Sequence, residues 1–394
     1  MAACTAAAAL LQLDGTLIAV ALPSVGRGLH VSGAATSALL SAYFAAYALA
    51  LIPGGVLVDR VGSRRVALGG LAVFGLAAAV GALAGDFGVL LAARVVQGAG
   101  AGFVSPAALA GAVSLFPPER RGSALGLWGA SAGAANVLGP LLGGLLTVAF
   151  GWRADWWVLV PATLAVSVLL IRMLPSGVRG DRARGSGILS NPVVRSAAAI
   201  TALTFAVMIG SFYLAEQYLQ RVAGYSALAA GAVLVVIAVL VALAAPCAGR
   251  MVDRRGEAVT ALIGFMLAGV GLAVLGIPGV PLHDVATLGP LVPLGLGLGL
   301  LFAPPSRAAL NATGASAHGR TSALLSIGRM LGAGIGTGLA GVALAHGVST
   351  HAVHHELLAA AAVCLILGLP ASLRLPSGNL GIRATSSEGE LTPS

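Results

Sequence analysis

The sequence has no lysine and little charge of either sign. All 22 basic residues are arginine, 13 residues are acidic, and charged residues make up 9% of the 394 positions. A soluble globular domain usually carries about 25% charged residues, so a solvated domain is excluded. Hydrophobic residues instead fill 58% of the chain, with a mean hydropathy of +0.97. This composition is typical of an integral membrane protein.

Cysteine is also scarce. The three cysteines, Cys4, Cys247 and Cys364, lie far apart in apolar stretches. This spacing excludes a disulfide framework and a cysteine metal site. Histidines gather near position 350, where a solvated loop explains them better than a bound metal. The sequence shows no phosphate-binding loop, ATPase motif or Ser/His/Asp set, so we expect no metal, no cofactor and no enzymatic activity.

The hydrophobic residues fall into twelve runs, each about as long as a helix that crosses a hydrocarbon core of about 30 Å. Strands of a membrane barrel would alternate apolar and polar residues, whereas these runs are apolar throughout. Because backbone groups in lipid must be satisfied internally, the runs predict α-helices. We expect an all-α integral membrane protein with helices near residues 3–24, 36–58, 66–85, 87–109, 123–148, 156–174, 196–219, 228–248, 258–278, 286–308, 321–345 and 353–373.

The arginines predict the orientation of these helices. If the N-terminus is cytoplasmic, sixteen arginines fall in cytoplasmic turns and the tail, three fall in outer turns, and three lie within or beside helices. An excess of arginine marks the cytoplasmic side. We therefore expect a multi-pass protein of the plasma membrane with both termini in the cytoplasm. The net charge of +9 reflects this topology, and nucleic-acid binding is not expected.

A short charged turn occurs twice in the chain. It reads Gly-Val-Leu-Val-Asp-Arg-Val-Gly at 55–62 and Gly-Arg-Met-Val-Asp-Arg-Arg-Gly at 249–256, an offset of 249 − 55 = 194 residues. Arg-Gly-Ser-Ala-Leu at 121–125 and Arg-Thr-Ser-Ala-Leu at 320–324 also match, at an offset of 320 − 121 = 199. Recurrence at half-length predicts two parallel six-helix halves. The expected divisions are an N-terminal half at 1–174, a cytoplasmic linker at 175–195, a C-terminal half at 196–375 and a disordered tail at 376–394.

The repeated turn carries residues suited to joining helix ends. Its glycines allow a tight reversal, and Asp59 and Asp253 can cap the N-terminus of a neighbouring helix or pair with an arginine there. A fixed loop contact and a latch that opens during conformational change would use the same residues, and both readings stay open. The candidate latch residues are Gly55, Asp59, Arg60, Gly62, Arg64, Gly249, Asp253, Arg254 and Gly256.

Asp14 is the leading candidate for a functional site. A carboxylate at the centre of a membrane helix costs about 2.5–3.5 kcal/mol even on the gentler insertion scale, so it usually faces a cavity or a partner. Arg94, early in the fourth run, lies at a comparable depth, so the two can form a pair. A proton-carrying carboxylate and a permanent structural ion pair are both compatible with this placement.

Five further charged or polar candidates lie in apolar runs. Glu216 stands near the outer end of the seventh run, where it could bind a proton or a cationic compound with Tyr213 and Tyr218 supplying π faces. Plain solvation of Glu216 is the competing interpretation. The full set of candidates for proton coupling and substrate binding is Asp14, Arg94, Gln97, Tyr213, Glu216, Gln217 and Arg329.

Five motifs follow one another along nearly the whole chain. The first run contains Leu13-Asp14-Gly-Thr16, the repeated turn follows the second run, and the fourth run contains Arg94-Val-Val-Gln97-Gly98. The fifth run carries Gly139, Pro140, Gly143 and Gly144, and the eleventh carries Arg329-Met-Leu-Gly332. This pattern resembles the major facilitator superfamily, and more narrowly its drug:proton antiporters.

The resemblance implies the major facilitator fold, with twelve helices in two six-helix halves. It also implies a secondary transporter that exports small amphipathic or cationic compounds in exchange for protons by alternating access. The glycine-proline motif of the fifth run is associated in that group with exchange, although a packing kink would look the same. A metabolite exporter or uptake permease of the same fold is the alternative; a membrane sensor or enzyme is disfavoured. The expected partners are a small-molecule substrate, protons and the lipid bilayer, and the expected state is a monomer.

Overall fold

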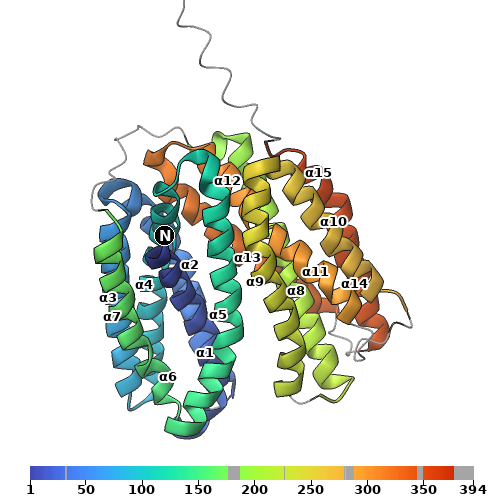
Figure 1. Cartoon of the computed structure of the whole chain (residues 1–394). Coiled ribbons are helices and arrows are strands. Elements are labelled where there is room, and N and C mark those ends of the chain that lie inside the picture. The colour runs from blue at the N-terminus through green and yellow to red at the C-terminus, as the bar shows by residue number, and fades with distance from the viewer. Residues whose placement is uncertain are drawn as a thin grey trace, which may run out of the picture.

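The computed structural model describes residues 1–31, 33–175, 187–225, 227–278, 280, 288–343 and 349–376. Helices make up nearly all of these segments, and the described residues include no strand. The centre of the expected linker, 176–186, and the expected tail beyond residue 376 lie outside the described residues. Figure 1 shows the helices side by side in one bundle.

The first half of the chain supplies the first six spans. Its elements are α1 (Ala2–Leu29), α2 (Gly33–Val61), α3 (Ser63–Leu83), α4 (Phe87–Ser114), the 3₁₀ turn η1 (Pro118–Arg120), α5 (Arg121–Phe150), α6 (Arg153–Trp157) and α7 (Leu159–Met173). The expected run at 156–174 corresponds to α6 and α7 together, which meet at Val158.

The second half supplies six more. Its elements are η2 (Ile188–Ser190), α8 (Pro192–Arg221), α9 (Ala227–Arg255), α10 (Glu257–Leu275), α11 (Leu288–Leu300), α12 (Ala303–Asn311), η4 (Ala315–Ala317), α13 (His318–Ala343), α14 (Thr350–Ala362), the π-helical segment η5 (Val363–Gly368) and α15 (Leu369–Ser372). The run at 286–308 forms two helices, because Pro304 and Pro305 lack a backbone N–H and suit the first turn of a new helix.

Eleven segments of the described chain are long and apolar enough to cross a membrane. The remaining expected span is α5, whose apolar part within the described residues is the shorter stretch Leu138–Phe150. Together these account for the twelve expected membrane helices. Leucine, isoleucine and valine side chains on the outside of the bundle, such as Leu49 at 76% and Val148 at 87% exposure, suit contact with lipid.

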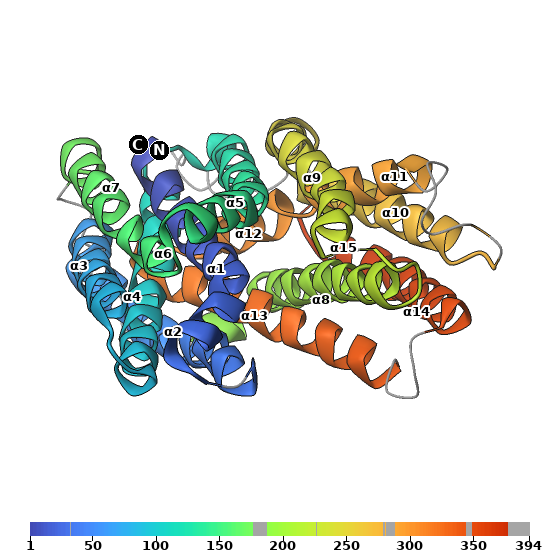
Figure 2. The same cartoon turned by 90° about the horizontal axis from the view of Figure 1, so that it is seen from below.

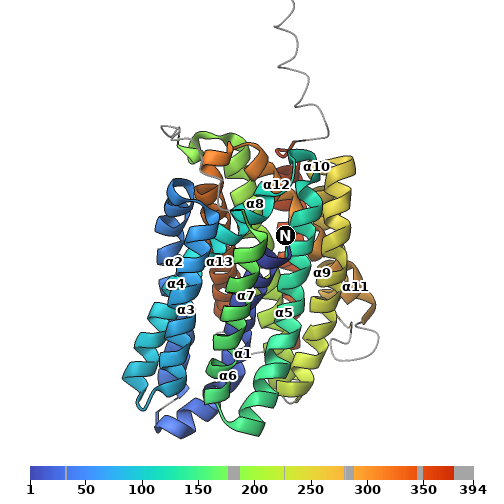
Figure 3. The ribbon, with the colours of Figure 1, turned by 60° about the vertical axis from the view of Figure 1, so that its left-hand side comes forward.

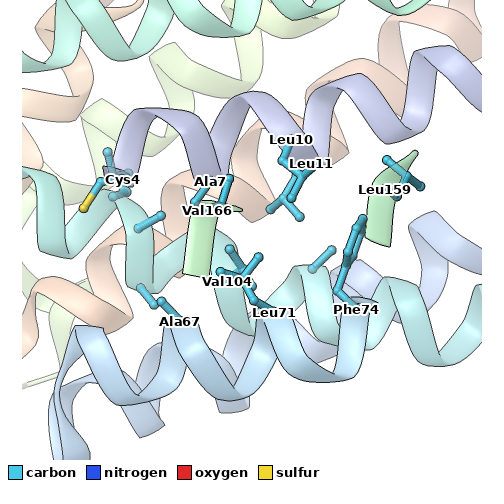
Figure 4. Packing of buried hydrophobic residues seen from close by; sticks show 14 of the residues in the cluster. Cys4, Ala7, Leu10, Leu11, Ala67, Leu71, Phe74, Val104, Leu159 and Val166 are labelled. Atoms are coloured by element: carbon cyan, nitrogen blue, oxygen red, sulfur yellow. The ribbon is translucent and has the colours of Figure 1, made fainter. Parts of the chain in front are cut away.

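Two apolar clusters form the core, one mainly in each half, and the first also includes Ala248, Val252, Leu300, Ala303 and Leu310 of the second half. The first cluster joins α1, α3, α4 and α7, and its side chains interdigitate around Leu71 and Phe74 (Figure 4). The second cluster runs from Ala197 to Leu375 and centres on residues such as Phe265, which is fully buried. Seen along the bundle, the two groups of helices lie beside each other (Figure 2). Two packed cores in one bundle are the structural form of the sequence repeat.

The halves meet mainly along two pairs of helices. Helix α5 lies against α9, and α2 lies against α13 (Figures 2 and 3). Glycines permit both approaches: a Cβ on Gly55 would lie 2.7 Å from the backbone oxygen of Gly319, and one on Gly249 would overlap the backbone of Gly122. Small residues let helix backbones come close in lipid, where no hydrophobic force drives helices together. These glycines all lie at one end of the bundle, called here the basic end, which includes the turns at 61–63, 115–121, 255–257 and 311–318.

Candidate functional site

Asp14, Arg94 and Gln97 form one buried cluster inside the first half. Nη1 of Arg94 lies 3.0 Å from each carboxylate oxygen of Asp14 and donates to Oε1 of Gln97 at 2.9 Å. Nε2 of Gln97 donates to Oδ1 of Asp14 at 3.1 Å. All three side chains are 0% exposed. A helix rises in 3.6-residue turns, so positions 94 and 97 project from the same face of α4 toward α1.

The Arg94 guanidinium is surrounded on its remaining sides by α2. Its Nε donates to the backbone oxygen of Leu39 at 3.5 Å, and its Cζ lies 4.2 Å from the centre of the Tyr43 ring. Its Nη2 makes no hydrogen bond to a described residue. The ion pair therefore leaves the cluster neutral overall, with one spare donor, in surroundings from which water is excluded.

This arrangement has a specific chemical capability. Breaking a buried ion pair by removing one charge is costly, roughly 3–5 kcal/mol, because the other charge is left without compensation. A proton bound to Asp14 would remove its negative charge and weaken the contact with Arg94. Protonation at this position would thus change the forces that hold α1 against α4. The contact between α1 and α4 at this cluster therefore depends on the charge of Asp14.

Arg329 lies away from this cluster, at the boundary between the two halves. It is half-buried on α13, interacts electrostatically with Tyr47 of α2, and forms no ion pair within the described chain. One turn away, the hydroxyls of Ser326 and Ser105 lie 3.3 Å apart and join α13 to α4. An intramembrane cation beside polar groups from both halves is a candidate contact for a substrate.

The candidates on α8 stand apart from the buried cluster. Glu216 is exposed and accepts a hydrogen bond from Nε2 of Gln220 at 3.2 Å. Tyr213 packs against the second core, and the buried Oε1 of Gln217 has no hydrogen-bond partner in the described chain. No described hydrogen bond or ion pair connects Glu216 to Asp14. The structure therefore separates the sequence candidates into a cluster in the first half, a position at the boundary between the halves and a group on α8.

The first copy of the repeated turn joins the two halves; we call this contact the first latch. The Asp59 carboxylate, at the end of α2, accepts hydrogen bonds from the backbone N–H groups of Gly319 and Arg320 at 2.7 and 3.2 Å. Nε of Arg320 adds a third bond at 2.8 Å. An aspartate of one half thus caps the N-terminal turn of α13 in the other, where the helix dipole favours negative charge.

The second copy makes the reciprocal contact, the second latch. Asp253, near the end of α9, accepts hydrogen bonds from the backbone N–H groups of Gly122 and Ser123, each at 2.9 Å, and from Oγ of Ser123 at 2.5 Å. Its Oδ1 also lies 3.9 Å from Nε of Arg307. Two related contacts therefore close the bundle at the basic end, and each half supplies the aspartate of one of them.

Among the remaining turn residues, the glycines shape the chain reversals and the arginines take no part in the two contacts. Gly62 and Gly256 precede α3 and α10 with φ of 92° and 87°, in the left-handed region that only glycine adopts easily. Arg60 and Arg254 are exposed and Arg64 is half-buried, and none of them forms an ion pair in the described chain. The tight reversal expected from the glycines is present at both turns.

The latches use a different register from the second sequence match. The match of 121–125 with 320–324 has an offset of 199, whereas the atoms that cap the two aspartates come from Gly122 and Gly319, an offset of 319 − 122 = 197. Arg320 consequently occupies the place that Ser123 has in the second latch. The sequence match located the right turns, but the geometry of the approach between helix backbones sets the register.

The glycines of α5 place that helix directly against α1. A Cβ on Gly139 would overlap the side chain of Thr16, and one on Gly143 would lie 2.5 Å from the backbone oxygen of Leu17. Gly144 is less constrained, with 3.9 Å to Val20 Cγ1, and Pro140 is exposed. The motif therefore contacts α1 within one turn of Asp14.

Sequence reasoning missed several participants. Arg307 donates through Nη1 to the backbone oxygen of Val252 at 2.7 Å and lies 3.6 Å from Oε1 of Glu257. Tyr43 and Tyr47, one helical turn apart with ring centres 6.1 Å from each other, lie between Arg94 and Arg329. An arginine inside an apolar run was the available signal for Arg307, whereas nothing in the local sequence distinguishes these tyrosines from packing residues.

With this geometry in view, comparison with known proteins settles the family. The family model described as the Major Facilitator Superfamily matches residues 4–337. The chain belongs to that superfamily. Its members with this fold are transporters, and the twelve-helix architecture in two halves agrees with this membership.

The relatives include proteins named for drug resistance. The puromycin resistance protein of Streptomyces alboniger is 42% identical over 180 residues, which cover 45% of this chain and 35% of that protein. A multidrug resistance protein B homolog of Mycobacterium tuberculosis is 27% identical over 421 aligned positions, covering 91% of this chain and 77% of the relative. The chain thus spans about a third of the length of the first of these two relatives and most of the second.

Solved structures agree with the fold. The transporter FucP, crystallised in the outward conformation, has a TM-score of 0.76 with this chain and covers 95% of it at 17% sequence identity. At that identity the likeness concerns the arrangement of the helices alone.

Proposed function

We propose that this protein exports small amphipathic or cationic compounds of the drug type across the plasma membrane in exchange for protons. The basic end faces the cytoplasm in this proposal, because the sixteen arginines assigned to these turns and the tail would otherwise face outward. The protein acts as a monomer, and its two halves rock about a substrate bound between them. Relatives named for resistance to puromycin and to multiple drugs support the substrate class.

The observation that carries the proposal is the buried cluster of Asp14, Arg94 and Gln97. The described chain buries three acidic side chains: Asp155 and Glu257 lie in the first turn of a membrane span, whereas Asp14 lies near the middle of α1 and has one cationic partner. A proton entering from outside binds Asp14 and releases Arg94 from the pair. The membrane potential supplies about 2.3 kcal/mol per charge per 100 mV, so proton entry can drive export without ATP.

The second part of the coupling is the contact between α5 and α1. Gly139 and Gly143 seat α5 on Thr16 and Leu17, next to Asp14 along α1. The same α5 begins at the second latch, where Ser123 binds Asp253 of the other half. A change at Asp14 therefore reaches the boundary between the halves through one continuous helix, and opening of both latches admits substrate from the cytoplasm.

Everted membrane vesicles that contain the protein provide the test. A panel of cationic and neutral drugs is added and collapse of the pH gradient is recorded for the wild type, Asp14→Asn and Asp86→Asn. Asp86 caps α4 through a hydrogen bond from Val89 N, and asparagine caps a helix equally well, so this variant is the matched control. Collapse with the wild type and the control, but not with Asp14→Asn, is expected.

Other results would redirect the proposal. Proton-driven export that persists in Asp14→Asn would exclude Asp14 as the essential proton carrier. Substrate-dependent proton movement in the same direction as the substrate would make the protein an uptake permease. A dedicated metabolite would replace drugs as the substrate if no compound in the panel had an effect while a metabolite did.

A further inference from the structure

A pocket opens at the basic end beside the second latch. Its volume is about 440 Å³, and its walls come from both halves. The first half contributes Phe116, Arg120 and Ser123, and the second contributes Arg250, Asp253 and Arg254. The pocket therefore lies across the boundary that must open if the cytoplasmic side is to be exposed.

The pocket carries more positive charge than its own groups neutralise. Arg120, Arg250 and Arg254 are exposed, and none forms an ion pair in the described chain. Both oxygens of the one acidic side chain, Asp253, already accept hydrogen bonds from the start of α5. Arg250 has one weak contact, from Nη2 to Sγ of Cys247 at 3.6 Å. Three guanidinium groups thus converge on a space that the protein itself leaves uncompensated.

The aspartate has a closer counter-charge in the first latch than in the second. There, Arg320 follows the capping Gly319 and places its own Nε 2.8 Å from Asp59, so the latch contains its own counter-charge. In the second latch the equivalent position is Ser123, and the nearest arginine to the aspartate, Arg307, is 3.9 Å away on α12. The pocket beside the first repeated turn is different: its volume is about 10 Å³, and its walls, with Arg64 and Arg65, come from the first half alone. The pocket beside the second latch is lined by arginines of both halves.

We propose that this pocket binds a phosphate group, carried by an anionic phospholipid headgroup or by soluble phosphate, which bridges Arg120 of the first half to Arg250 and Arg254 of the second. Guanidinium groups bind phosphate oxygens through paired, charge-assisted hydrogen bonds. The pocket lies at the ends of membrane helices, the level at which headgroup phosphates are found. An anion that binds across the boundary stabilises the state in which the basic end is closed, because binding shifts an equilibrium toward the conformation that holds the ligand.

The consequence is a control on alternating access that is independent of the proton at Asp14. It uses the two-state movement of the proposed function but neither its substrate nor its direction. Arg172 and Arg195 provide a matched control, since both are exposed, lie at the ends of α7 and α8, and do not line the pocket. Replacing exposed arginines by glutamine leaves the packed cores unchanged, so all variants are expected to fold.

The test uses the full chain in nanodiscs of phosphatidylcholine, with or without phosphatidylglycerol, and in phosphatidylcholine with added inorganic phosphate. Spin labels at the ends of α5 and α9 report the fraction closed at the basic end, without substrate. We expect an anion to raise the closed-to-open ratio about tenfold, a change worth about 1.4 kcal/mol. Arg250→Gln/Arg254→Gln should abolish this rise, whereas Arg172→Gln/Arg195→Gln should retain it.

The arms of the experiment separate the sources of the phosphate. A rise that requires phosphatidylglycerol assigns the pocket to a headgroup, and an equal rise with inorganic phosphate alone assigns it to a soluble anion. Equal responses of the two double variants, or no response of the wild type to either anion, would overturn the proposal. Because the readout needs neither drug nor pH gradient, failure of the antiport assignment leaves this result interpretable.

Discussion

Nη1 of Arg94 lies 3.0 Å from both carboxylate oxygens of Asp14, in a site from which solvent is wholly excluded. Eighty residues of sequence separate the two, and Gln97 holds the same carboxylate from the next turn of α4. Removing the charge of either partner leaves the other charge buried without compensation, which is strongly destabilising. This dependence on both charges gives the pair its proposed role in proton coupling.

Asp14→Glu and Asp14→Asn should distinguish two variants of this site: one that can still bind a proton and one that cannot. Glutamate keeps the negative charge that compensates Arg94, so the variant should fold and retain part of the proton-coupled export. Asparagine cannot bind a proton at physiological pH. It should reduce proton-coupled export by at least about a hundredfold, the usual effect of removing a group that transfers a proton. Export rate measured against external pH in proteoliposomes is the readout. Equal export by wild type and Asp14→Asn at every pH would refute the role.

The latches predict a conformational effect of their aspartates. Asp59→Asn removes charge-assisted bonds to Gly319 and Arg320, each worth about 1.5–3 kcal/mol, and should shift the equilibrium toward opening at the basic end by roughly tenfold or more. Asp253→Asn should act in the same direction. Labelling of cysteines introduced at the buried ends of α2 and α9 measures the opening. A matched control is Asp86→Asn, at the opposite end of the fold, which should label like the wild type.

The seating of α5 on α1 predicts a sharp difference between two adjacent glycines. Gly143→Ala would place a methyl group 2.5 Å from the backbone oxygen of Leu17, and such overpacking costs about 1–3 kcal/mol. Gly144→Ala meets only Val20 Cγ1 at 3.9 Å and should be nearly neutral. The unfolding temperature in detergent and, in a separate assay, the transport rate of a drug substrate distinguish the two variants. Comparable losses in both variants would show that small size along this helix, rather than the fit to Leu17, is what matters.

Arg329 predicts an effect on substrate recognition without an effect on stability. Its guanidinium forms no ion pair in the described chain, so Arg329→Gln leaves no buried charge without a partner. The apparent KM for the transported compound should change about tenfold, while the unfolding temperature and the dependence of export on pH stay those of the wild type. A changed pH dependence with an unchanged KM would place Arg329 in proton coupling instead.

Much of the architecture could be predicted from the sequence alone. Twelve apolar runs of membrane length, a turn repeated at half-length and five motifs in order identify the fold class, because a helix in lipid satisfies its own backbone and needs no information from distant residues. Gly62 and Gly256 likewise predict the two chain reversals, because the positive φ that each reversal requires is adopted easily only by glycine. Helix ends differ by several residues and the tenth run divides at its prolines, because capping and backbone donors decide those positions locally.

The site depended on the tertiary structure. Local sequence places Asp14 and Arg94 at similar depths, but helix rotation decides whether they face each other, and packing of α2 decides that Tyr43 lies over the guanidinium. The partners of Asp59 and Asp253 belong to the opposite half, some 260 and 130 residues away. The position of a residue along one hydrophobic helix determines its depth in the membrane. The direction in which its side chain points, and the side chains it contacts, depend on how several helices pack together. The sequence by itself therefore determined the helices and their order, and only the packing of the two halves decided which charges meet.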